Sequence, residues 1–288
     1  MNERNRKVLT LVVKWDMENY LYEHGFSLEE FGQSYYKMYI HEEKLEQPEH
    51  IFKYYNDSQN SINSLLEGYF YFSEPKKLND PFECLNNREK QIINAASNKE
   101  KIIEHRENIG ICSFSLTNES PILWGHYTNN YHGFCLRFDN NLIKINEDLP
   151  VKTHVSYLKK YEPANNSLRE AKKQIMDAQI SEDLKSAIHA HLTTVFEYSW
   201  KQYDWNYENE FRYLSFSANS FQRKFKFDKN ALQEIYIDYR MRSRNRNVFN
   251  LLMFILKNKY PHVKAFEVKP HPLVVKLEFN QIEVKLEG

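Results

Sequence analysis

The sequence predicts an α+β protein, in which a mainly antiparallel sheet with flanking helices follows an N-terminal helical hairpin. Residues 1–47 carry apolar side chains at helical spacing, and the chain from Ile51 onward alternates short strand-like segments with helical ones. The sequence has no glycine between Gly133 and Gly288, and neither GxxxxGK[ST] nor GxGxxG occurs in it. These features argue against P-loop and Rossmann enzymes. The change of pattern after residue 47 predicts two units, an N-terminal helical extension over 1–47 and a single catalytic-like α+β domain over 48–288.

The N-terminal extension is predicted as two helices that end before Pro48. An apolar stripe marks the first helix, and a capping box of Ser27 and Glu30 opens the second. We expect this hairpin to pack on the main domain or to contact a partner protein. The stripe consists of Val8, Leu9, Val12, Val13 and Trp15.

The main domain is predicted as short strands separated by helices. The strands alternate with period two, and local signals bound the helices, such as Gly68 after one helix and Ser120 with Pro121 before another. A charged helix is expected at 88–107 and a longer helical region at 163–203. Strands are expected at 51–55, 69–73, 110–116, 132–139, 205–214, 232–238, 263–268 and 273–279, and shorter helices at 61–68, 120–130 and 248–260.

Composition narrows the class of protein. The chain has 288 residues, with 39 basic and 39 acidic side chains, so no net charge attracts it to nucleic acid or to an anionic membrane. Its three cysteines, Cys84, Cys112 and Cys135, lack the spacing of a zinc module or a disulfide framework. No apolar run approaches the length that spans a bilayer. We therefore expect a soluble cytoplasmic protein without a membrane partner.

The stretch "WNYENEFRYL", residues 205–214, sets two glutamates one residue apart. If it is a strand, Glu208, Glu210 and Arg212 share one face, and the aromatic side chains between them face the core. Two carboxylates at this spacing raise each other's pKa in a cleft unless a cation such as Arg212 compensates them. The acidic face is therefore either a solvated edge or a site.

Several phrases together resemble a bacterial family known as domain of unknown function 2971. They are "IFKYY", "YFYFSEPKKLNDPFEC", "CSFSLTNESPILWGHYTNNYHGFCLRFD", "VSY" and "WNYENEFR", in the family's order and over about residues 50–280. The chain differs from the family where Tyr55 stands in place of a frequent Arg, which touches a possible ligand site, and at "DYRM", where a Gly is frequent. The family name brings no established activity.

The polar-faced strands also resemble ADP-ribosyltransferases of the arginine, serine and glutamate class. In that class a first strand supplies a cation, a second carries Ser-x-Ser and a third carries Glu-x-Glu. The resemblance implies a twisted split sheet, NAD as substrate, no metal, and an unknown macromolecular acceptor, protein or nucleic acid, in a bacterial toxin or anti-phage effector. It implies Glu210 and Glu208 as catalytic residues, and as NAD-binding residues Lys53, Tyr54, Tyr71, Ser113, Ser115, His126 and Tyr127.

In NAD cleavage, each of the two glutamates, Glu208 and Glu210, could have its own role. Breaking the nicotinamide–ribose bond develops an oxocarbenium-like cation, which a fixed carboxylate stabilises. The second glutamate could orient or deprotonate the acceptor. Ser113 and Ser115 would hold the carboxamide or position Glu210, and Lys53 would pair with the pyrophosphate.

Each candidate also has a structural interpretation. Lys53, Ser113 and Ser115 also suit ordinary strand positions, and Asn79 and Asp80 before a proline suit a turn. Other candidates are expected in the wall of the site or in purely structural roles. Glu83 would form an ion pair with Arg137 or Arg212, Trp124 would lie in the core, and His126 is either a structural or a site residue.

Two further functions stay open. A metal-dependent nuclease or hydrolase could use Asp80, Glu83, His126 and Glu210, since carboxylates with one His suit Mg²⁺ or Mn²⁺. The second open function is a non-catalytic module that binds a nucleotide or a protein. The replacement of the family's frequent Arg by Tyr55 favours this function. Dependence on divalent metal separates the two enzymes, and binding without turnover identifies the module.

Overall fold

The computed structural model describes residues 10–27, 34–40, 43–80, 108–143, 151–160, 162–216, 218 and 222–285. The charged helix expected at 88–107, the site-wall residue Glu83 and Cys84 therefore lie outside the described residues.

The N-terminal segment forms a sheet, so the predicted helical hairpin was wrong. Four antiparallel strands follow one another in the order β1-β2-β3-β4. A two-residue turn joins the first two strands, with Glu18 at a φ of 53°. Val13 is buried whereas its neighbours Val12 and Lys14 are exposed, as the alternating side chains of a strand require. The strands are β1 (Thr10–Met17), β2 (Tyr20–Ser27), β3 (Ser34–Ile40) and β4 (Glu43–Lys44).

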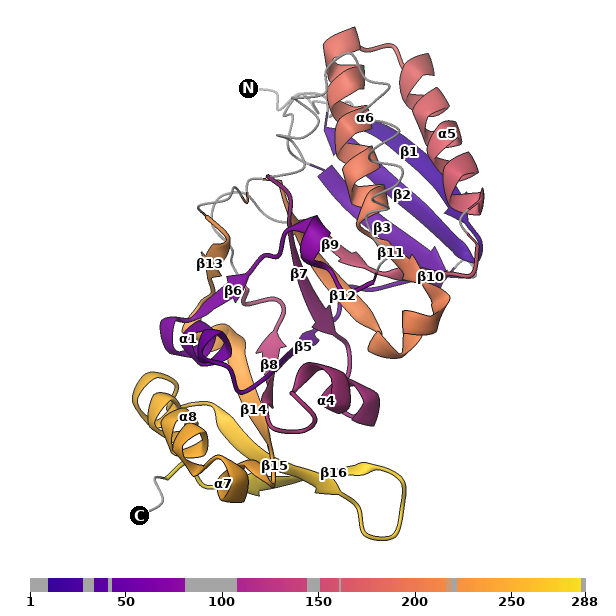
Figure 1. Cartoon of the computed structure of the whole chain (residues 1–288). Helices are drawn as coiled ribbons and strands as arrows, with labels where there is room; N and C mark the ends of the chain where they lie inside the picture. Colours follow the sequence, from indigo (N-terminus) through magenta and orange to yellow (C-terminus); the bar gives the residue numbers. More distant parts are fainter. Residues whose placement is uncertain are drawn as a thin grey trace, which may run out of the picture.

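The main domain is built on an eight-stranded sheet, which confirms the α+β class (Figure 1). Its strand order is β16-β15-β14-β8-β5-β7-β12-β9, and all neighbours are antiparallel except β14 and β15. The strands are β5 (His50–Tyr55), β7 (Gly110–Ser115), β8 (Phe134–Asp139), β9 (Val151–His154), β12 (Glu210–Ser215), β14 (Leu232–Asp238), β15 (Lys264–Pro270) and β16 (Leu277–Ile282). Two small sheets join β6 (Tyr69–Tyr71) to β13 (Lys224–Lys226), and β10 (Ser156–Leu158) to β11 (Trp200–Gln202).

Short helices flank this sheet, and those that begin at Gln59, Pro121 and Arg246 lie close to the predicted positions. Ser58 caps the first turn of α1, and Gly68 ends this helix in the left-handed conformation with a φ of 74°. Ser120 and Pro121 begin α4 as predicted. Apolar side chains of α1 and α8 pack into the largest core together with those of the sheet. The elements are α1 (Gln59–Glu67), α4 (Pro121–Tyr127), α7 (Met241–Arg244) and α8 (Arg246–Lys259), with 3-10 turns η1 (Pro75–Lys77), η2 (Tyr203–Glu208) and η3 (Lys229–Ala231).

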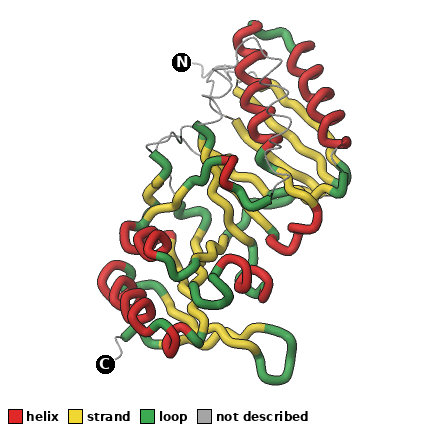
Figure 2. The backbone as a smooth tube through the Cα atoms, in the orientation of Figure 1, coloured by secondary structure: helices red, strands yellow, loops and turns green. Residues whose placement is uncertain are grey.

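A second core joins the N-terminal sheet to a helix pair that is distant in the sequence. The helical region expected at 163–203 forms two helices, α5 (Glu162–Asp177) and α6 (Glu182–Glu197), and Ser181 caps the second. Both lie across the sheet of β1–β3 (Figures 1 and 2). The buried side chains of this second core are Val13, Tyr22, Met38, Leu158, Ala171, Ile175, Ile188, Leu192, Phe196 and Trp200. The predicted boundary near residue 48 stays a prediction.

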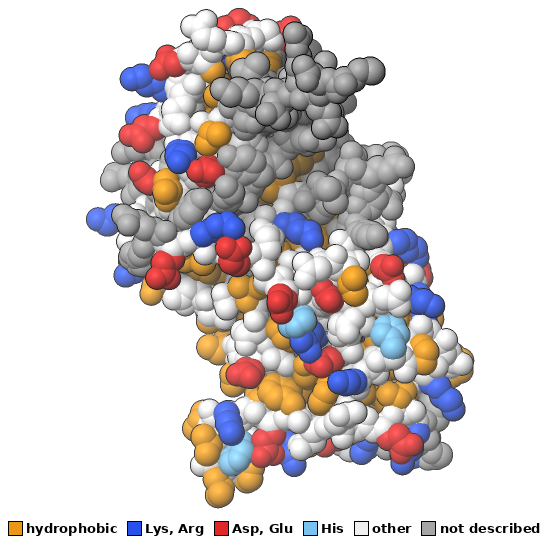
Figure 3. Space-filling model, turned by 180° about the vertical axis from the view of Figure 1, so that it is seen from behind, with side chains coloured by type: hydrophobic (Ala, Val, Ile, Leu, Met, Phe, Trp, Pro, Cys, Tyr) orange, Lys and Arg blue, Asp and Glu red, His pale blue; other side chains and the backbone are white. Residues whose placement is uncertain are grey.

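The last strand begins later than expected. The sequence pattern placed it at 273–279, but β16 spans Leu277–Ile282, and the apolar residues before it form the turn of a hairpin. Leu273 is 88 % exposed there, and hydrophobic side chains are visible at the end of this hairpin, at the lower left of Figure 3. Among the described residues, no helix is both long and apolar enough to cross a membrane.

We predict that Gly133→Ala destabilises the protein. A Cβ at this position would lie 1.9 Å from the carbonyl oxygen of Tyr55, so the backbone of β5 or β8 must move. We expect a loss on the order of 1–3 kcal/mol in the free energy of unfolding, measured by urea denaturation.

Gly125→Ala is the matched control. Gly125 lies in α4, and the nearest atom to a new Cβ there, in the ring of Tyr131, is 4.0 Å away. This variant should gain about 0.4–1 kcal/mol, because alanine restricts the unfolded chain. Equal stability of the two variants would contradict the close approach at Gly133.

Candidate functional site

A cavity of about 260 Å³ lies where β5 and β7 share little backbone pairing. These six-residue strands pair through one register position, Phe52 with Ser115, although both are fully paired on their other sides. Fifteen residues line the cavity: Phe52, Lys53, Tyr54, Lys77, Leu78, Asn79, Ser113, Phe114, Ser115, Leu123, Tyr127, Lys201, Glu208, Glu210 and Arg212.

The three strands predicted to carry the site are neighbours in the sheet, in the order β5-β7-β12. The ammonium of Lys53 donates a hydrogen bond of 2.8 Å to the carbonyl of Ser113, which bridges the gap between β5 and β7. The side chain of Ser113 acts on the carboxylate of Glu210 and helps to lower its pKa. The hydroxyl of Ser115 donates to the carbonyl of Glu208 at 2.8 Å. The cation, the serines and the acidic pair therefore line the same cavity.

The two glutamates reach the cavity by a different route from the predicted one. Residues 205–214 were predicted as one strand, but Glu208 ends the 3-10 turn η2, and β12 begins only at Glu210. Asn209 between them is left-handed, with a φ of 44°, a conformation that asparagine tolerates better than most residues. The chain turns a corner at Asn209, and both carboxylates face the same cavity. Tyr207 lies outside the core and contacts His126.

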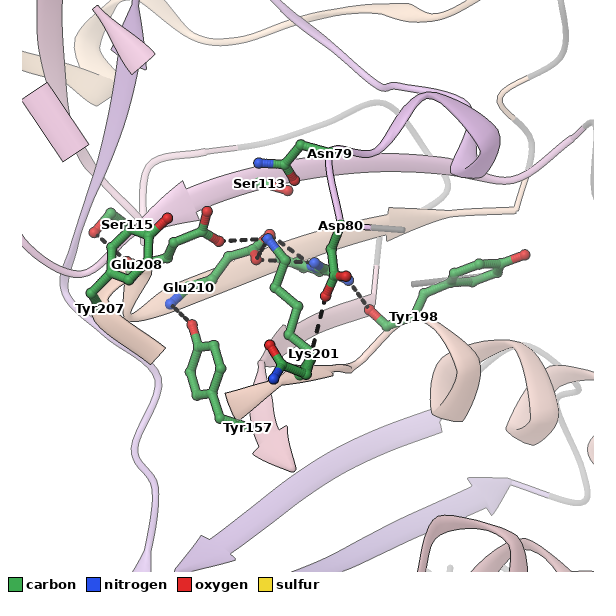
Figure 4. Close-up of polar contacts among 12 residues, drawn as sticks. Asn79, Asp80, Ser113, Ser115, Tyr157, Tyr198, Lys201, Tyr207, Glu208 and Glu210 are labelled. Atoms are coloured by element: carbon green, nitrogen blue, oxygen red, sulfur yellow. Dashed lines mark hydrogen bonds and ion pairs between the residues drawn. The ribbon is translucent and has the colours of Figure 1, made fainter. Parts of the chain in front are cut away.

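Glu210 is held as an anion by two cations (Figure 4). Arg212 binds both of its oxygens, with distances of 2.7 Å from Nε and 3.0 Å from Nη2, and Lys201 Nζ lies 3.1 Å from Oε2. Burial acts to raise the pKa of Glu210, but the charges of Arg212 and Lys201 outweigh it and lower the pKa below its usual value. Glu210 is therefore ionised at neutral pH.

For Glu208, burial and charge repulsion outweigh the effect of the nearby cation, so its pKa shifts in the opposite direction. Lys201 Nζ lies 2.5 Å from its Oε2, and the hydroxyl of Tyr127 donates to its Oε1. Burial and the adjacent charge of Glu210 nevertheless raise the pKa of Glu208 above its usual value. One carboxyl of the pair is thus a fixed anion and the other binds a proton more readily, a division of roles typical of acid–base sites.

Lys201 and Tyr157 are residues that the sequence interpretation missed. Lys201 lies on β11, a strand outside the main sheet, and no local pattern marks it. Tyr157 accepts the backbone N–H of Glu210 at 2.7 Å. It belongs to the quoted "VSY" phrase, so the resemblance was the one signal that could have identified it.

Three predicted side chains, Asn79, Tyr127 and Tyr54, line the cavity beside the acidic pair. Asn79 Nδ2 donates to the hydroxyl of Tyr127 at 2.6 Å, which in turn donates to Glu208. Tyr54 also lines the cavity, and its hydroxyl donates to the carbonyl of Thr117 at 2.9 Å.

Other candidate residues lie outside the cavity lining. Tyr71 was expected to stack on a ligand there, but it is 42 % exposed on β6. Trp124 is fully buried beside Tyr54, as a core residue. Arg137 pairs with Glu234 at 2.8 Å, and its expected partner Glu83 lies outside the described residues.

Tyr55, where the family often has Arg, does not line the cavity either. Its ring stacks on Phe134 at 5.3 Å in the core, and its centroid lies 5.9 Å from Lys53 Nζ. The difference from the family pattern thus falls in the core beside Lys53, and not in the lining itself.

Of the four residues of the metal hypothesis, Asp80, His126 and Glu210 are described, and Glu83 lies outside the described residues. Glu210 lines the cavity, His126 Nδ1 lies 3.0 Å from the hydroxyl of Tyr207, and Asp80 is buried near the backbone N–H of Gln202. Within the part of the chain that the structure describes, no group of three His, Cys, Asp or Glu residues is arranged to hold a metal ion.

The comparisons with known proteins agree with part of the predicted resemblance. The model of a family described as "Protein of unknown function (DUF2971)" matches residues 123–213. This region includes the acidic pair and Lys201 but not Lys53. No curated protein and no solved structure matches the chain, so the comparisons give no support for similarity to ADP-ribosyltransferases.

The opposite shifts of the two glutamates predict opposite effects on stability. The lowered pKa of Glu210 contributes stability above its unfolded value, and this contribution is lost as the pH falls through the folded value. Glu210→Gln should therefore lose about 3–5 kcal/mol at neutral pH, because the buried Arg212 loses the carboxylate that it binds and Lys201 loses one of its two.

Glu208 behaves in the reverse sense. Its raised pKa contributes stability below the unfolded value, and that stability is lost as the pH rises through the folded value. Glu208→Gln should then be at least as stable as the wild type at neutral pH. Urea denaturation of both variants at neutral and mildly acidic pH tests the pair, and equal losses in both would contradict this assignment.

Proposed function

We propose that the protein cleaves the nicotinamide–ribose bond of NAD and transfers ADP-ribose to a macromolecule or to water. One observation carries the proposal: a cation from β5, two serines from β7 and the acidic pair before and on β12 line one cavity on adjacent strands. The nearly separate halves of the sheet at β5 and β7 agree with the split sheet that the resemblance implies.

The proposed chemistry assigns different roles to the two glutamates. The bond between C1′ of the ribose and the pyridinium nitrogen breaks, its electron pair goes to the nitrogen, and neutral nicotinamide leaves. The ionised carboxylate of Glu210 stabilises the positive charge that develops on the sugar. A hydroxyl of the acceptor or of water then attacks C1′, and its proton goes to Glu208. A carboxylate with a raised pKa is a stronger base in its ionised form, which suits this role.

The size and lining of the cavity suit the reactive half of the dinucleotide. Its volume of about 260 Å³ is below the roughly 300–1,000 Å³ of pockets that enclose whole drug-sized ligands. Phe52, Leu78 and Leu123 provide apolar surface for a flat ring, and Ser113 and Asn79 provide polar groups for a carboxamide or a ribose. The phosphates would meet the cations of the lining, Lys53 and Lys77.

The proposal is tested by incubating purified protein with labelled NAD and cell lysate in the presence of EDTA, and measuring free nicotinamide and labelled macromolecules. We expect release by the wild type and a loss of about 100-fold or more in Glu210→Gln. Glu234→Gln is the matched control, because this glutamate also pairs with an arginine but lies outside the cavity. Ser113→Ala, which removes a side chain that helps to lower the pKa of Glu210, provides a second variant should Glu210→Gln unfold.

Three results would contradict the proposal. NAD binding without nicotinamide release would favour a binding module. Cleavage of nucleic acid that requires Mn²⁺ would favour the hydrolase. Equal release by the wild type and by folded Glu210→Gln would remove Glu210 from the reaction.

A further inference from the structure

Two short strands connect the N-terminal sheet to the acidic pair. β10 and β11 pair in parallel, with Tyr157 opposite Lys201 and Ser156 opposite Trp200. Because side chains alternate along a strand, Tyr157 and Lys201 lie on one face of this two-stranded ribbon, and Ser156 and Trp200 lie on the other.

One face of the ribbon packs against the N-terminal unit, by which we mean the sheet of β1–β4 together with α5 and α6. Leu158 and Trp200 are buried in the second core with side chains of β1–β3, α5 and α6. The hydroxyls of Tyr22 and Ser156 form a buried hydrogen bond. The hydroxyl of Tyr20 accepts the backbone N–H of Tyr157 at 3.2 Å.

The other face holds both glutamates (Figure 4). The single ammonium of Lys201 contacts Glu208 at 2.5 Å and Glu210 at 3.1 Å, and its side chain is only 3 % exposed. It also lies 5.0 Å from the ring centroid of Trp205, which fixes it from the side of η2. The hydroxyl of Tyr157 fixes the backbone of Glu210.

We propose that Lys201 and Tyr157 are positioning residues that hold Glu208 and Glu210 together in the cavity, and that the N-terminal sheet with α5 and α6 fixes the ribbon that carries them. The catalytic consequence rests on the proposed function, whereas the positioning itself does not.

The physical reason lies in the charge balance. Arg212 compensates Glu210, so Lys201 is the cation that allows a second carboxylate to be buried beside it. If Lys201 loses its charge, burial and the repulsion from Glu210 act on Glu208 with less opposition. Glu208 then binds its proton more tightly and is less available as a base at neutral pH.

The test is a pH titration of the glutamate side-chain carboxyl carbons by NMR in the full chain, with signals assigned through Glu208→Gln and Glu210→Gln. Lys201→Met should raise the proton affinity of Glu208 about tenfold or more, and Lys201→Arg should keep it near the wild-type value. Lys159→Met is the matched control, since Lys159 lies over the ring of Tyr203 on η2 but does not line the cavity. Thermal unfolding checks that each variant folds.

A folded Trp200→Leu variant tests the remote part of the proposal. Trp200 adjoins Lys201 but packs into the second core, so its truncation should shift the Glu208 titration in the same direction. If Lys201→Met shifts the titration and Trp200→Leu does not, the role of the N-terminal unit is overturned. An unchanged titration in folded Lys201→Met overturns the whole inference.

The pH profile of nicotinamide release separates this inference from the proposed function. Lys201→Met should lose activity at neutral pH and recover it at higher pH, and Lys201→Arg should behave like the wild type. A shifted Glu208 titration without nicotinamide release from any variant would refute NAD cleavage and support the positioning. Release by the wild type with unchanged profile and titration in Lys201→Met would leave NAD cleavage in place and overturn the positioning.

Discussion

Two carboxylates buried side by side need compensating charge, and this constraint organises the centre of the molecule. Glu208 and Glu210 are both buried, and like charges at such separation disfavour each other in a medium of low dielectric constant. Arg212, which lies on β12 with Glu210, and Lys201, which lies on β11, supply the counter-charges. Because these groups come from β11, η2 and β12, the charge cluster joins the main sheet to the unit formed by β1–β4, α5 and α6. The same contacts give the two carboxyl groups different proton affinities.

The cavity exists because two neighbouring strands stop pairing. A strand edge inside a protein leaves backbone groups that need partners. Lys53 meets part of this need by donating to the carbonyl of Ser113 across the gap. The cation of β5 thus has a structural role beside the cavity that it lines.

Much of the main domain could be predicted because its signals are local. Caps such as Ser120 and Gly68, and the alternation in "GICSFS", depend on neighbours in the sequence. The N-terminal sheet could not be predicted in this way, because the apolar residues near Val13 fit the spacing of a helix as well as that of a strand. The side chains of α5 and α6 that pack against this sheet lie far along the chain. The left-handed Asn209 moved Glu208 off the predicted strand, which a period-two pattern cannot foresee. Lys201 was missed because its contacts arise only when the ribbon packs against β12.

The long connection inside the second core also affects how the protein is made. Val13 and Trp200 share this core, so the N-terminal strands emerge from the ribosome well before the helices that cover them. Contacts between such distant segments form late, and uncovered strands in the meantime are prone to wrong pairing. Since Lys201 follows directly on Trp200, the charge cluster is completed only when these strands find α5 and α6. A nascent chain would thus remain without an organised site until most of its length has been synthesised.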